Sequence, residues 1–102
     1  MQFSLTDARL LVRNAPEVSK LADRCLSIRG YKWPDDPAVM MYSVDDNCSK
    51  GASRSFGLYF VNLRTGNVYS GSPDNPPVQS ERLKRTRDSL LRKKGLAKKN
   101  TN

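Results

Sequence analysis

The stretch that most constrains the fold of this chain is residues 56–69, with the sequence FGLYFVNLRTGNVY. Its first eight residues are mostly aromatic, β-branched or leucine, which suits a pleated and half-buried surface. Residues 64–67 then supply the residue types of a tight reversal, because a glycine reaches positive φ without a steric cost. Residues 68–69 begin a return strand. The stretch therefore predicts a β-hairpin.

Side chains alternate between the two faces of a strand, and here both faces are apolar. One face is expected to carry Tyr59, Val61 and Leu63, and the other Phe56, Leu58 and Phe60. One set should pack on helices. The other set also needs a cover, from a C-terminal helix, from a second copy of the chain or from a partner protein. This second apolar face is the main physical reason to expect a binding protein.

The chain has 102 residues, which is enough for one domain with a modest core. No run of about 18 apolar residues occurs, so the sequence predicts no membrane-spanning helix. The N-terminus leads directly into helix signals, without a basic segment followed by an apolar one, so no signal peptide is recognised. We expect either a cytoplasmic protein or an exported protein written without its leader.

Two helices are predicted before the sheet. Ser4 can cap the first one and Asp7 lies three residues later, and Pro16 ends it near residue 14. The second is expected to run from residue 16 to Gly30, since glycine is a common stop. It is supported by an apolar series at helical spacing. That series is Val18, Leu21, Ala22, Cys25 and Ile28.

The second half of the chain predicts strands, a linker and one more helix. Residues 38–44 read as a strand, and residues 45–55 as a long polar loop before the hairpin. A linker rich in proline follows, and Ser80 then caps a helix of roughly residues 81–94, which Gly95 ends. The expected division is an α+β domain over residues 1–72, a linker over 73–80, and a basic helix with a disordered tail over 81–102.

The charge of the chain is concentrated at its C-terminal end. The net charge is +8, and the residues from 81 onward contribute nine basic and two acidic side chains. Such a segment is either a solvated, solubilising end or a surface for the phosphate backbone of nucleic acid or for anionic lipid. The candidate polyanion-binding residues are Arg82, Lys84, Arg85, Arg87, Arg92, Lys93, Lys94, Lys98 and Lys99.

The side chains argue against catalysis and against a metal or cofactor. The chain has no histidine, which removes the commonest general base and zinc ligand. No nucleotide-binding loop is recognised, and two cysteines cannot build a structural zinc site unaided. The acidic pairs at residues 35–36 and 45–46 do not match the spacing of a calcium loop, so they read as solvated or capping acids. We expect no enzyme activity, no cofactor and no metal.

The two cysteines, Cys25 and Cys48, admit two interpretations. In the first they form a disulfide between a helix and a loop, which implies an oxidising compartment such as the periplasm or the extracellular space. In the second Cys25 is a small core hydrophobe and both thiols are free, which fits the cytoplasm. The disulfide is the favoured interpretation.

Two segments of the chain resemble small exported bacterial domains of the PepSY or cystatin-like type. They are LTDA with APEV near the N-terminus, and the hairpin sequence over residues 56–69. In such domains one or two helices precede an antiparallel sheet that a similar strand closes. The resemblance covers roughly residues 4–70. It implies a non-enzymatic periplasmic or cell-surface domain that binds or inhibits another protein.

Taken together, these features predict an α+β fold in which two N-terminal helices pack on an antiparallel sheet of three or four strands, followed by a basic C-terminal helix. The expected function is binding or inhibition of another protein, in the manner of an immunity protein or an enzyme inhibitor. A homodimer is also considered. The alternative is a nucleic-acid-associated protein that acts through its basic end. The candidate partner contacts are Trp33, Tyr59, Arg64 and Tyr69, because exposed aromatic and arginine side chains dominate many interfaces. The alternative for each of them is a place in the core, and for Trp33 the two interpretations have equal weight.

Overall fold

A computed structural model of the chain describes residues 2–48 and 54–95, with the side chains of residues 54–56 left out. The fold is α+β, with a four-stranded antiparallel sheet in the order β1-β2-β3-β4. Its elements, in chain order, are α1 (Leu5–Arg13), the 3₁₀ turns η1 (Val18–Lys20) and η2 (Asp23–Cys25), β1 (Leu26–Lys32), β2 (Val39–Asp46), β3 (Arg54–Asn62), β4 (Val68–Ser70) and α2 (Glu81–Lys93).

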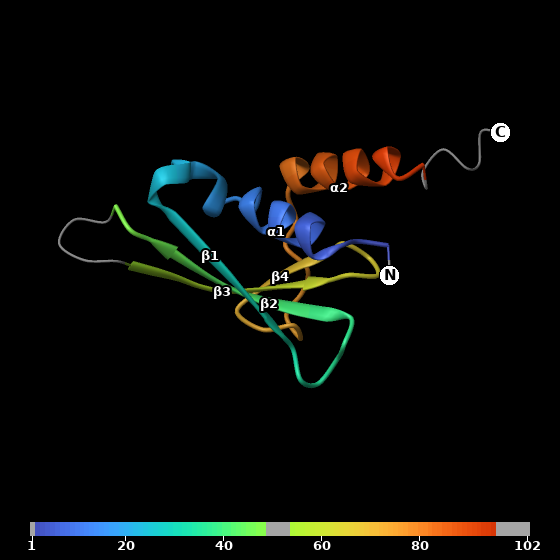
Figure 1. Ribbon diagram of the computed structural model, residues 1–102, viewed down its shortest axis with the longest axis horizontal. Helices are drawn as coiled ribbons and strands as arrows, with labels where there is room; N and C mark the ends of the chain where they lie inside the picture. Colours follow the sequence, from blue (N-terminus) through green and yellow to red (C-terminus); the bar gives the residue numbers. More distant parts are fainter. Residues whose placement is uncertain (1, 49–53, 96–102) are drawn as a thin grey trace.

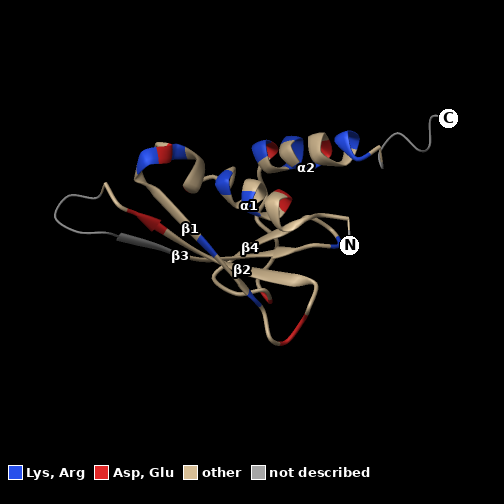
Figure 2. Cartoon of the chain, viewed as in Figure 1, with Lys and Arg blue, Asp and Glu red and all other residues tan. Residues whose placement is uncertain are grey.

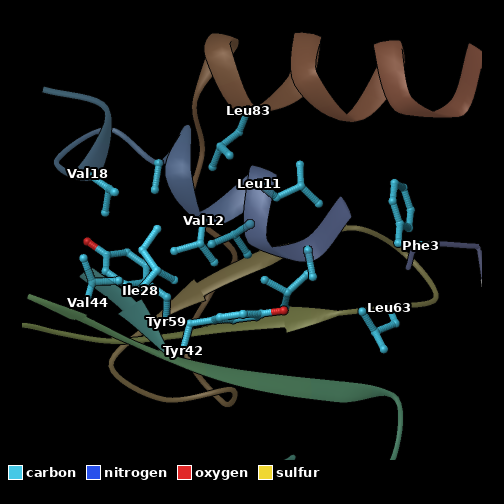
Figure 3. Packing of buried hydrophobic residues seen from close by; sticks show 14 of the residues in the cluster. Phe3, Leu11, Val12, Val18, Ile28, Tyr42, Val44, Tyr59, Leu63 and Leu83 are labelled. Atoms are coloured by element: carbon cyan, nitrogen blue, oxygen red, sulfur yellow. The ribbon is translucent and has the colours of Figure 1, made fainter. Parts of the chain in front are cut away.

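The molecule has three layers, and α1 lies between the sheet and α2 (Figure 1). The two helices are antiparallel. Lys94, just beyond α2, pairs with Asp7 near the start of α1, with Nζ and Oδ2 2.6 Å apart. At the other end, Arg82 donates a hydrogen bond from Nε to the side-chain oxygen of Asn14 at 2.8 Å. Leu83 points from α2 toward α1 and joins the same core as the sheet residues (Figure 3).

The first predicted helix is confirmed, and its start follows from local chemistry. The Ser4 hydroxyl accepts a hydrogen bond from the Asp7 amide, and the Asp7 carboxylate accepts one from the Ser4 amide. This reciprocal capping satisfies two amides that have no partner within the helix. Leu11 and Val12 are fully buried, so the helix presents its apolar stripe to the core.

The predicted second helix is wrong, and with it the expectation of two N-terminal helices packed on the sheet. The segment instead forms two short 3₁₀ turns and then strand β1. The second helix of the fold is α2, at the C-terminal end. The apolar residues at helical spacing therefore lie in two turns and a strand. Cys25 and Ile28 of this series are buried, whereas Ala22 is exposed.

Arg13 explains why the second helix does not form. Its guanidinium donates hydrogen bonds to the carbonyl oxygens of Val18 and Leu21, at 2.9 and 2.8 Å, and to the carboxylate of Asp23. In an α-helix those carbonyls would accept from amides four residues later. Here the Leu21 amide and Arg13 both donate to the Val18 carbonyl, and Arg13 donates to the Leu21 carbonyl, so the segment is held in turns. The strand that follows pairs with β2 along its whole length.

The predicted hairpin is confirmed as β3 and β4. At its turn, the side-chain oxygen of Asn62 accepts from the amides of Arg64 and Thr65, and its carbonyl accepts from the amide of Gly66 at 2.7 Å. Gly66 has a φ of +78°, which is the left-handed region that glycine occupies without strain. The turn also lies against the N-terminal segment, because the Phe3 amide donates to the Leu63 carbonyl.

The two faces of β3 divide as the alternation predicts. Tyr59, Val61 and Leu63 belong to the core between the sheet and α1, whereas Phe60 and Leu58 lie on the opposite face. The register shifts between Val44 and Asp45 of β2, so β3 has a bulge at residues 55–57, where Gly57 has a φ of +108°. The prediction that Phe56 shares the face of Leu58 and Phe60 concerns a side chain outside the described ones.

The predicted C-terminal helix is confirmed, and it contributes to the core. Leu83 and Leu90 are 2% and 7% exposed. The preceding segment is also attached to the body, because the Val78 amide donates to the Val68 carbonyl at 2.7 Å and its side chain packs against the core. The division into residues 1–72, 73–80 and 81–102 stays a prediction, and residues 96–102 lie outside the described chain.

The contact between the helices predicts a dependence of stability on pH. Burial of the Asp7 carboxyl acts to raise its pKa, but hydrogen bonds from Lys94 and Ser4 outweigh this effect and hold the pKa below its ordinary value. A lowered pKa gives stability that is present above the unfolded-state pKa and is lost as the pH falls through the folded-state pKa. Urea unfolding between about pH 5 and pH 1 should therefore show a steeper acid loss for the wild type than for Asp7→Asn.

Glu17→Gln is the matched control for this comparison, because Glu17 lies on the surface and its ion pair with Lys20 is long, at 3.8 Å. It should keep the pH profile of the wild type. Equal acid slopes for the wild type and Asp7→Asn would contradict the predicted role of Asp7.

Candidate partner-binding face

The face of the sheet that points away from α1, called the outer face below, carries a groove of about 470 Å³. Its floor and walls hold the aromatic side chains of Trp33, Phe60 and Tyr69 together with Leu58. Leu58 is 39% exposed, and Tyr31 on β1 is 45% exposed. In the sheet register Tyr31, Met41, Phe60 and Tyr69 form one row across the four strands, so Tyr31 continues the apolar surface beyond the groove.

Trp33 is held over the outer face by its contact with Phe60 and by the backbone of its loop. The two rings meet edge to face, with centroids 5.0 Å apart and an interplanar angle of 81°. The Trp33 amide donates to the Val39 carbonyl at 3.2 Å. Phe60 is only 2% exposed, whereas Trp33 stays half-buried, so the tryptophan both covers Phe60 and borders the groove.

The opposite wall of the groove is the loop after β4. The Gly71 amide donates to the Leu58 carbonyl at 2.9 Å, and the Asp74 amide donates to the Ser72 hydroxyl at 3.1 Å. The Asn75 side chain closes the loop with a hydrogen bond to the Ser70 carbonyl. This loop and Trp33 therefore cover part of the outer face. The basic helix α2 does not, because it packs on α1 on the other side of the sheet (Figure 1).

Three carboxylates belong to the lining of this groove: Asp35, Asp36 and Asp74. Asp36 also has a structural role, since its Oδ1 accepts a hydrogen bond from the Ala38 amide at 2.9 Å. Within the described residues none of the three forms an ion pair. Among the side chains that the structure describes, no lysine or arginine lines the groove. The groove is thus aromatic at its centre and negatively charged at its rim.

The four residues expected to contact a partner lie in three different parts of the structure. It brings Trp33 and Tyr69 together on the outer face. It places Tyr59 in the core at 6% exposure, where burial, with a smaller effect from the charge of Glu17, raises the pKa of the phenol. Arg64 is exposed in the hairpin turn, outside the groove lining. The acids and Leu58 were not among the expected contacts. Alternation along β3 already indicated the side on which Leu58 lies.

Basic residues recur along α2 (Figure 2), and their side chains have several different surroundings. Arg82, Arg85 and Lys93 line a shallow groove of about 400 Å³ between α2 and Leu10 of α1. Lys94 is paired with Asp7. The other basic side chains of the helix are Lys84 and Arg92, which are exposed, and Arg87, whose Cδ lies close to Gly66. Lys98 and Lys99 lie outside the described residues.

Cys25 and Cys48 form a disulfide, with their Cα atoms 5.0 Å apart. The bridge ties the turn before β1 to the second residue after the end of β2, next to a hydrogen bond from the Asn47 amide to the Cys25 carbonyl. The carboxylate of Asp46 lies near both sulfur atoms, but two bridged sulfurs are not thiolate ligands. The disulfide therefore has a structural role. In the described part of the chain, no helix is long and apolar enough to cross a membrane.

Comparison with known proteins supplies one likeness, at the level of the fold. No family model matches the chain, and no curated protein matches it. A solved structure described as a type VI secretion system effector–immunity complex from Pseudomonas protegens contains a similar chain, with a TM-score of 0.64 and 20% sequence identity. The match covers 91% of this chain and 78% of the other. The resemblance to PepSY or cystatin-like domains gains no support from these comparisons.

Proposed function

We propose that this protein is a non-enzymatic protein-binding module of the immunity type, which protects a cell by occupying a toxic partner. The observation that carries the proposal is the outer face, where a preformed groove leaves aromatic and aliphatic side chains accessible. Contiguous exposed apolar surface of this kind is typical of interaction sites. The likeness in fold to a chain of an effector–immunity complex supports the same class of function.

The outer face has the properties of an interface centre. Trp33 and Tyr69 border the groove, and aromatic residues with a polar end supply large contact area at a low cost in conformational entropy. Leu58 and Tyr31 extend the apolar surface to the side. The absence of histidine from the chain supports binding rather than catalysis.

The disulfide supports a periplasmic or extracellular location for this function. Disulfides persist in oxidising compartments and are rare in the cytosol. The bridge between Cys25 and Cys48 joins two segments of the folded body, so it stabilises the native domain and leaves the groove untouched. A protein that meets a delivered toxin outside the cytoplasm fits these features.

The proposal is tested by affinity capture from the native organism with three forms of the protein. The wild type should retain a partner that the double variant Trp33→Ala, Tyr69→Ala loses. The variant Lys84→Ala, Arg92→Ala changes exposed side chains on the far side of the fold and should retain it. The captured partner should be toxic when produced alone and tolerated when this protein is produced with it. A partner that all three forms retain equally, or one without toxicity, would overturn the proposal.

A second candidate function is attachment to the phosphate backbone of nucleic acid through α2. It is favoured by the groove beside Leu10, where three basic side chains lie together without an acidic one. Binding of this kind weakens steeply as salt rises. Measuring affinity for duplex and single-stranded nucleic acid at several salt concentrations, with wild type and the variant Arg82→Gln, Arg85→Gln, Lys93→Gln, tests it. Absence of salt-dependent binding by the wild type would remove this candidate.

A further inference from the structure

We infer that the groove of the outer face receives an arginine side chain from a segment of the partner protein. This inference rests on the proposed function and adds the chemistry that the partner must present at this site. It follows from three properties of the groove: the sign of its charge, the shape of its aromatic walls and the rigidity of the two loops that frame it.

The first property is a local reversal of charge. The chain as a whole carries +8, yet the groove has three carboxylates and no basic residue among its lining side chains. Asp35 and Asp36 come from the loop before β2, and Asp74 comes from the loop after β4, so the fold brings together acids almost 40 positions apart. Within the described chain they have no ion-pair partner. A cationic group entering the groove would complement this field.

The second property selects arginine among cationic groups. Trp33 and Tyr69 offer ring surfaces beside the carboxylates. A guanidinium is planar, is weakly hydrated, stacks on aromatic faces and presents a fork of donors that fits a carboxylate. A lysine ammonium is a compact, strongly hydrated point charge. An apolar side chain would use the aromatic walls but would leave the carboxylates desolvated and unpaired.

The third property is that the groove is already formed in the free protein. The loop before β2 is fixed by the hydrogen bond from the Ala38 amide to Asp36 and by the contact of Trp33 with Phe60. The loop after β4 is fixed by the hydrogen bond from the Gly71 amide to the Leu58 carbonyl and by the hydrogen bond from the Asn75 side chain to the Ser70 carbonyl. Little ordering is required when a ligand enters a site of this kind, so more of the interaction energy contributes to affinity.

The inference is tested with short capped peptides as probes: acetyl-Gly-Arg-Gly-amide, the same peptide with citrulline, and the same peptide with lysine. Citrulline keeps the shape of arginine and removes its charge. In a ¹H–¹⁵N titration, the arginine peptide should shift the Trp33 indole signal and the backbone amides of Gly71, Ser72 and Asp74. The citrulline peptide should bind at least about tenfold more weakly, and the lysine peptide should fall between them.

Two protein variants make the test specific. Asp35→Asn with Asp74→Asn removes two rim charges whose side chains form no ion pair with a described residue, and should weaken arginine-peptide binding about tenfold. The control, Glu17→Gln with Glu81→Gln, makes the same change of charge at exposed sites outside the groove lining and should bind as the wild type does. An unchanged spectrum away from the substituted positions establishes that each variant is folded.

Several results would overturn the inference. They are no shift at the groove, equal binding of the arginine and citrulline peptides, and equal binding by both variants. Groove shifts that depend on protein concentration without peptide would assign the site to a second copy of the chain instead. A partner whose capture requires Trp33 but tolerates Asp35→Asn with Asp74→Asn would refute the arginine while leaving the proposed function intact. Binding of the arginine peptide by a protein whose captured partner is not toxic would refute the proposed function and leave the arginine site intact.

Discussion

Replacing Gly66 with alanine is expected to lower the free energy of unfolding by about 2–4 kcal/mol. Gly66 occupies the left-handed region, with a φ of +78°, where a side chain costs about 1–2 kcal/mol. It also has no room for one. A Cβ atom would lie 2.7 Å from Cζ of Phe3 and 2.9 Å from Cδ of Arg87. Phe3 is 3% exposed, so it cannot move aside without disturbing the core.

Gly71→Ala is the matched control for this substitution. Gly71 has a similar φ of +85°, but the nearest atom to an added Cβ is the Asn75 side-chain nitrogen, at an ordinary contact distance of 3.4 Å. It should lose only the conformational part, about 1–2 kcal/mol. Urea unfolding, followed by far-UV circular dichroism, measures both variants. A loss for Gly66→Ala no larger than that for Gly71→Ala would show that the contact with Phe3 is dispensable.

Opening the disulfide is expected to cost about 3 kcal/mol of stability, because the chain-entropy model assigns this value to a bridge across a loop of this size. The sequence separation of Cys25 and Cys48 is 23 residues. The variant Cys25→Ser, Cys48→Ser should therefore unfold at a lower urea concentration than the oxidised wild type. Adding a reductant to the wild type should produce a similar loss.

The double serine variant also serves as the control for the reductant, because its own unfolding midpoint should not change when the reductant is added. Titration of unreduced native protein with a thiol reagent should find no reactive thiol. Two reactive thiols in native material would remove the main support for an oxidising compartment. An unchanged midpoint on reduction would show that the native contacts around Cys25 suffice without the bridge.

The parts of the fold that sequence predicted are those that neighbouring residues determine. The cap formed by Ser4 and Asp7, the hairpin turn around Gly66 and the C-terminal helix after Ser80 each depend on residues within a few positions of one another. The failed prediction, the second helix, depended on distant groups. Hydrogen bonds from Arg13 and pairing with β2 overrode an apolar spacing that suited a helix.

In the candidate site, too, local features were predicted from the sequence and contacts between distant segments were not. Alternation along β3 indicated which side Phe60 and Leu58 share, and a second apolar face was expected to need a cover. No sequence pattern predicted that Trp33 contacts Phe60, or that Asp35 and Asp74 line the same groove. Those contacts depend on how two loops fold back against the sheet, and the loop sequences have no hydrophobic periodicity from which this could be predicted.

The placement of α1 between two layers imposes an order on how the fold can open. Helix α2 contacts the rest of the molecule largely through α1, with Leu83 and Leu90 as its buried anchors. Its detachment leaves the sheet and α1 in contact. Loss of α1, in contrast, removes the support of α2 and uncovers the inner face of the sheet at once. Opening of the contact between α1 and α2 is therefore expected to leave the groove on the outer face unchanged, because no residue of α2 lines that groove.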